Sequence, residues 1–122
     1  MSNRDSRLFM RELIADHPQL RPSYEEHLED NDGELLPHLL IADICRWVVA
    51  EQDSNPFQVL QLLSWLEIHF VGVGLVMDDV DNVIAVSFIE HLPLPSELGA
   101  GVVLLLGPKM KAQYEQFFSQ PR

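Results

Sequence analysis

The sequence is short of basic residues, of cysteine and of long apolar runs. Its 122 residues include 8 Lys and Arg against 19 Asp and Glu, a formal net charge of −11. Nucleic acids and anionic membrane surfaces are bound largely through Lys and Arg, so the shortage of bases argues against both as partners. The charge favours a basic protein as partner, although a charge of one sign can also serve only to keep a domain soluble.

The low cysteine content and the short apolar runs bear on the compartment. Cys45 is the single cysteine, so no disulfide can form within the chain. The N-terminus has no apolar segment of the kind that secretion signals carry. The longest apolar run, residues 99–107, has about half the length that a membrane-spanning helix needs. We therefore expect a protein of the reducing cytoplasm with no membrane segment.

The sequence does contain a succession of helical patterns. With 47% hydrophobic residues, a chain of this length can form one domain with its own core. Apolar residues recur at helical spacing between Pro, Gly and Asn-Asp signals, and no segment alternates like a strand. The pattern predicts helices over 4–16, 22–30, 35–51, 56–70, 80–92, 97–106 and from 108 onward. We expect an all-α fold, a compact bundle of about six or seven short helices in a single domain spanning residues 1–122.

Two segments need a separate comment. Residues 56–70 are apolar nearly all round, which predicts the central helix of the bundle. Residues 71–76 contain two glycines among apolar residues, so they can either continue that helix or form a short strand.

The acidic residues are unevenly distributed. Residues 25–34 hold one group: Glu25, Glu26, Glu29, Asp30, Asp32 and Glu34. A second group is Asp78, Asp79 and Asp81. No Lys or Arg occurs between Arg46 and Lys109, so this stretch is predicted to contribute negative charge without compensation. Surfaces that serve only solubility normally mix both signs, so we expect these acids to form a partner-binding surface.

A third candidate region lies on the helix predicted over 35–51. Asp43, Trp47 and Glu51 are four residues apart and share a face, on the side away from Cys45. Aromatic anchors with a charged rim are typical of protein interfaces, but a boundary tryptophan that covers the core fits the same pattern. Cys45 lies on the apolar stripe and is interpreted as a core residue, not as a nucleophile.

Motifs for catalysis or for a cofactor are missing from the sequence. The five histidines form no His-Glu-x-x-His pair, and cysteine pairs for a transition metal are absent. The acids do not match the calcium-loop spacing, and no glycine-rich loop or nucleophile elbow is present. We expect neither an enzyme nor a metal or cofactor site.

Three stretches carry a resemblance to a known kind of protein: residues 36–44 (LPHLLIADI), 83–92 (VIAVSFIEHL) and 106–110 (LGPKM). With the size and acidity of the chain, they resemble small all-helical bacterial proteins encoded beside polymorphic or contact-dependent growth-inhibition toxins. The resemblance implies a cytosolic immunity protein that binds and neutralises a cognate toxin domain. The acidity suggests that such a toxin is basic and nuclease-like. The alternative is a regulatory or adaptor domain that binds another basic protein.

Overall fold

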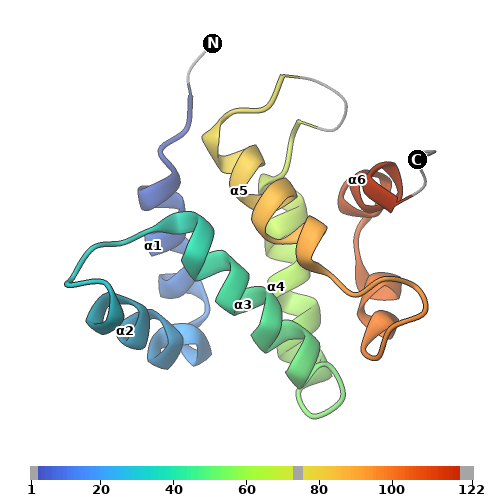
Figure 1. Cartoon of the computed structure of the whole chain (residues 1–122), viewed down its shortest axis with the longest axis horizontal. Helices are drawn as coiled ribbons and strands as arrows, with labels where there is room; N and C mark the ends of the chain where they lie inside the picture. Colours follow the sequence, from blue (N-terminus) through green and yellow to red (C-terminus); the bar gives the residue numbers. More distant parts are fainter. Residues whose placement is uncertain (1–2, 73–75, 119–122) are drawn as a thin grey trace.

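The computed structural model describes residues 3–72 and 76–118 (Figure 1). These residues form six α-helices and three short 3-10 helices (labelled η), and they contain no strand. In chain order the elements are α1 (Ser6–Asp16), η1 (Pro18–Leu20), α2 (Arg21–Asp30), α3 (Pro37–Glu51), α4 (Pro56–His69), α5 (Asp79–Ser87), η2 (Ile89–His91), η3 (Ala100–Leu105) and α6 (Pro108–Phe118). The expected all-α fold is confirmed. No helix in the described ranges is long and apolar enough to cross a membrane.

Most helices begin at a local signal in the sequence. Pro37, Pro56 and Pro108 are the first residues of α3, α4 and α6, where the missing N–H of proline leaves no helical hydrogen bond unmade. Asp5 and Asp78 cap α1 and α5, and their side chains accept backbone N–H groups of the first turn.

Two predicted helices differ from what forms. The helix predicted over 80–92 ends as α5 at Ser87 and is followed by the separate turn η2. The helix predicted over 97–106 is only the 3-10 helix η3, which begins after Gly99, whose backbone is in a left-handed conformation with φ of 86°. A residue with this backbone geometry cannot belong to a right-handed helix.

Helix α3 is the central element of the core. It packs on α1, α2, α4, α5 and η3, and Figure 1 shows it crossing the middle of the molecule in front of α4. Its buried stripe includes Leu40, Ile41, Ile44 and Val48. The prediction that residues 56–70 form the central helix is therefore wrong.

Helix α4 has one covered face and one open face. It buries Val59, Leu62, Leu63 and Leu66, which lie on one side of a helix by their spacing. It packs mainly on α3, α5 and α6, so its opposite side has little to cover it. The helix ends at His69. Val71 and Gly72 are not helical, and residues 73–75 of the ambiguous segment lie outside the described residues.

Candidate functional site

Helix α2 and the turn after it carry a group of exposed acidic residues. Glu25, Glu26, Glu29 and Asp30 lie on α2, and Asp32 and Glu34 lie in the turn; all six are exposed. Within residues 3–72 and 76–118, none of the six carboxylates has a hydrogen bond or an ion pair. We call these six residues the α2 acidic surface.

The buried side of α2 orients this surface toward solvent. His27 is buried, and its Nε2 accepts the backbone N–H of Leu36 at 3.0 Å, which ties α2 to the start of α3. Tyr24 and Leu28 are half-buried against the core. The helix ends in the expected turn, with Asp32 and Gly33 both in the left-handed conformation (φ 55° and 82°). The turn therefore extends the acidic surface beyond the last turn of α2.

The electrostatics of α2 are unfavourable to the fold. Glu25 and Glu29, and likewise Glu26 and Asp30, are four residues apart, where like charges face each other on a helix. Glu29 and Asp30 also lie in the last turn, at the negative end of the helix dipole. No bond in the described structure offsets these repulsions, so local structural needs do not explain why the residues are acidic.

The second acidic group, by contrast, is occupied in structural contacts. The Arg4 guanidinium donates to Asp78 Oδ2 at 2.6 Å and to Asp81 Oδ1 at 2.9 Å, and also to the His69 carbonyl at 2.6 Å. Asp81 is only 3% exposed and additionally accepts the Val71 N–H. Hydrogen bonding from Arg4 lowers the pKa of Asp78 from 3.8 to about 2.

These contacts correct the prediction that this group contributes negative charge without compensation, whereas partner binding by the exposed Asp79 remains a prediction. Asp81 is buried and cannot meet a partner, and the charge of Asp78 is compensated by Arg4, which lies outside the stretch without bases. Asp79 is exposed but exchanges two hydrogen bonds with Asn3. Figure 1 also shows the start of α5 at the top of the molecule and α2 at the lower left, so the two acidic groups do not form one surface.

The third candidate region, on α3, is half-buried. Asp43 forms an ion pair with Arg46 of the same helix. Trp47 packs against the core, as a boundary tryptophan does, and keeps only part of its surface open. Glu51, at the end of α3, is half-buried. A role of these three residues in partner binding remains a prediction.

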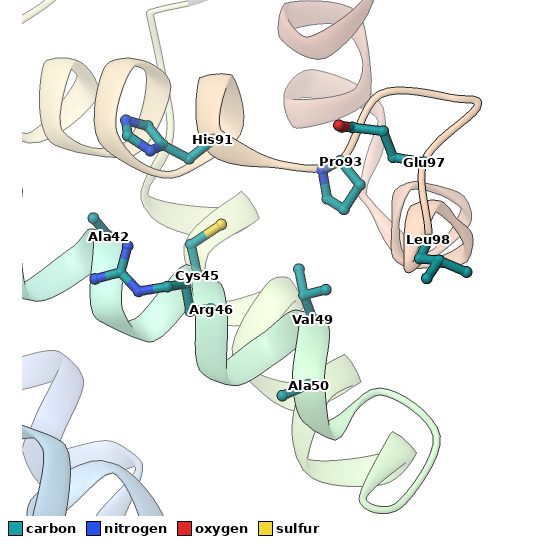
Figure 2. A pocket seen from close by; sticks show the side chains of 9 residues that line it. All are labelled: Ala42, Cys45, Arg46, Val49, Ala50, His91, Pro93, Glu97 and Leu98. Atoms are coloured by element: carbon teal, nitrogen blue, oxygen red, sulfur yellow. The ribbon is translucent and has the colours of Figure 1, made fainter.

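A groove of about 610 Å³ lies between α3 and the segment that follows α5. Figure 2 shows Cys45 and Val49 on its α3 side, facing Pro93 and Glu97. Desolvation by burial raises the pKa of the Cys45 thiol to about 12, and the thiol donates to the Phe88 carbonyl. A buried thiol with a raised pKa is a poor nucleophile, which agrees with the interpretation of Cys45 as a core residue.

Sequence reasoning missed the open face of α4. Phe57 and Ile68 are each 72% exposed, and Leu60 is 46% exposed. The sequence held one signal for this: Gln61 and Ser64 share a face with Phe57 and Ile68, at spacings of four, seven and eleven residues. Two polar residues on the face that Phe57 and Ile68 share indicate that this face is at the surface.

Metal ligands do not gather anywhere in the described ranges, where no group of three or more His, Cys, Asp or Glu side chains is placed to hold an ion. Residues 10–120 match the profile of a domain of unknown function (DUF7674). No protein with curated annotation and no solved structure matches the chain.

Proposed function

Because the chain belongs to the DUF7674 family, whose function is unknown, we propose a function from its surface: the domain binds a basic protein through the α2 acidic surface. The supporting observation is that six exposed carboxylates lie together without a structural partner among the described residues. By contrast, Asp5 and Asp78 cap helices, and Asp43, Asp78 and Asp81 form ion pairs. The α2 acidic surface is the group of neighbouring acids in the described chain that the fold leaves without a bond, whereas other unbonded acids such as Glu12, Asp53 and Glu90 lie on separate segments.

Such a surface attracts positively charged molecules electrostatically before they make contact. Carboxylates of one sign on a single helix and its turn produce a local negative field, which accelerates encounter with a positively charged partner. The field repels nucleic acid and anionic lipid, so a basic protein is the complementary class of partner.

Immunity to a toxin is the specific form of this function that we propose. A toxin domain that cleaves nucleic acid needs a basic cleft for its substrate. The α2 acidic surface would occupy that cleft in place of the phosphates and so exclude the substrate. The resemblance of residues 36–44, 83–92 and 106–110 to proteins encoded beside such toxins is what favours immunity over an adaptor role.

Two variants of equal net charge test the surface. The first is Glu25→Gln/Glu26→Gln/Glu29→Gln on α2. The control is Glu12→Gln/Asp53→Asn/Glu90→Gln, which removes three exposed acids elsewhere that have no bond to another described residue. Both variants and the wild type are used to capture proteins from the native host, and the captured proteins are quantified by mass spectrometry.

The expected result is a basic protein recovered with the wild type and with the control variant, and depleted with the α2 variant. Equal recovery with all three proteins, or a captured partner that is itself acidic, would contradict the proposal. Expression of the captured partner alone separates the two forms of the function. If the chain is an immunity protein, the partner alone should stop growth, and co-expression of this chain should restore it. If the chain is an adaptor, the partner alone should not be toxic.

A further inference from the structure

The open face of α4 is a second candidate for contact with a partner. Phe57, Leu60 and Ile68 together present a large apolar area to solvent on one side of a single helix. Isolated exposed apolar residues are common on protein surfaces, but contiguous ones mark interaction sites. An apolar depression of this kind can receive the apolar face of an amphipathic helix.

The face is hollowed and has a fixed wall. A depression of about 510 Å³ runs along it, lined by the three apolar residues and by Trp65, His17 and Asp16. Trp65 is held in place because its Nε1–H donates to Asp16 at 2.8 Å and its ring stacks on His69 at 3.9 Å between centroids. A rigid aromatic wall loses little conformational entropy when a partner binds.

The charge around the hollow indicates what it receives. No Lys or Arg lines it, and Asp16 supplies a carboxylate at its edge. Among the described residues, Asp16 accepts one hydrogen bond, from Trp65, whereas a carboxylate can accept about four. A second copy of this chain would bring another −11 of charge toward the same face, which disfavours self-association.

We infer that the α4 hollow docks a cationic amphipathic segment of the partner protein, with apolar side chains against Phe57 and Ile68 and a Lys or Arg near Asp16. This inference rests on the proposed function for the basic character of the partner. The α4 hollow would supply the apolar contact area that the α2 acidic surface lacks. Electrostatic attraction sets the rate of encounter, and the buried apolar contact sets the lifetime of the complex.

A model peptide tests the hollow on the full chain. The probe is a synthetic amphipathic helix of Leu and Lys, about 14 residues or four turns long, and an identical peptide with Glu in place of Lys is its charge control. Binding is followed by amide chemical shifts of the isotopically labelled protein, and affinity is taken from the titration.

Matched variants locate the binding site. Phe57→Ser/Ile68→Ser removes the apolar anchors. Leu98→Ser/Leu104→Ser removes two equally apolar residues, 97% and 78% exposed, that lie outside the hollow. All four side chains are mostly exposed, so both variants should keep the native amide spectrum.

The expected result is that the Lys peptide shifts amides of α4 and α1. We expect the Phe57→Ser/Ile68→Ser variant to bind it at least about tenfold more weakly, and the control variant to bind within about twofold of the wild type. Equal losses in both variants, equally tight binding of the Glu peptide, or concentration-dependent dimerisation that the Phe57→Ser/Ile68→Ser variant abolishes would overturn the inference.

The α2 variant Glu25→Gln/Glu26→Gln/Glu29→Gln separates this inference from the proposed function. If the peptide changes amide chemical shifts only in α2, and these changes vanish in the α2 variant, the α4 inference is refuted and the proposed role of the α2 acidic surface is retained. If the α2 variant binds the peptide normally and also retains the captured host partner, the proposed role of the α2 acidic surface is refuted and the α4 inference is retained. Binding to neutral lipid vesicles that depends on Phe57 and Ile68, without peptide binding, would assign the face to a membrane instead.

Discussion

Replacing Glu29 by Gln and Asp30 by Asn should stabilise the fold. The double substitution removes two like-charge pairs at helical spacing, with Glu25 and with Glu26, each worth about 0.2–0.5 kcal/mol. It also removes two negative charges from the last turn of α2, each worth about 0.3–1 kcal/mol at low ionic strength. Because the side chains are exposed, we expect a gain near the lower end of the combined range, about 1 kcal/mol or about 4 °C in Tm.

Urea unfolding at two ionic strengths measures this gain. The free energy of unfolding of the variant should exceed that of the wild type at about 20 mM salt, and the difference should shrink toward zero at about 500 mM, where charges at the surface are screened. Glu67→Gln provides a contrast with the same chemical change. Glu67 accepts the N–H groups of Lys109 and Met110 at the start of α6, so its neutralisation should cost about 1–2 kcal/mol.

The result bears on function because its sign depends on what the acids do. Neutralising a carboxylate that holds the structure together lowers the stability of the fold. Neutralising a carboxylate that serves a partner raises it, because binding sites commonly lower the stability of the protein that carries them. Destabilisation by Glu29→Gln/Asp30→Asn, or a gain that salt does not change, would refute the electrostatic reasoning for α2.

Three further predictions concern the structural contacts. Gly107→Ala should destabilise by about 1–2 kcal/mol in urea unfolding, because the new Cβ would lie 2.5 Å from carbons of Glu67 and displace this cap from α6; an unchanged midpoint would show that Glu67 keeps both bonds. The folded-state pKa of Asp78 is depressed from 3.8 to about 2, so its contribution to stability is complete above about pH 4 and is lost as the pH falls toward 2. Arg4→Met should flatten that part of the measured pH dependence, and an unchanged slope would contradict the assignment. The Cys45 thiol, with its pKa raised to about 12 by burial, should react with an aromatic disulfide reagent at pH 8 only as fast as the protein unfolds, and a rate like that of a free cysteine would disprove its burial.

Local signals made much of the fold predictable from sequence. Proline at a first turn and Asp at a cap act within a few residues, so the starts of α4 and α6 coincide with those predicted, and α5 begins within one residue of its predicted start. The turn at Asp32 and Gly33 is likewise a local choice of backbone conformation. The α2 acidic surface followed from the density of acids between residues 25 and 34.

Contacts distant in sequence made the rest unpredictable. Asp78 and Asp81 appeared uncompensated because their partner, Arg4, is more than 70 residues away in the chain. Residues 56–70 are apolar nearly all round, but composition does not reveal how many other elements pack on a helix, and it is α3 that lies at the centre of the fold. The open face of α4 became visible only when the packing was known.

The association rate constant measured against ionic strength tests the central claim most directly. The claim is that the α2 acidic surface attracts a basic protein, and the measurement uses the partner captured from the host, with the wild type and the Glu25→Gln/Glu26→Gln/Glu29→Gln variant. We predict that the wild-type rate constant falls at least about tenfold between about 20 and 500 mM salt, and that the variant associates more slowly with a shallower salt dependence. A wild-type rate constant that does not change with salt, or a variant that matches the wild type at every ionic strength, would contradict the claim.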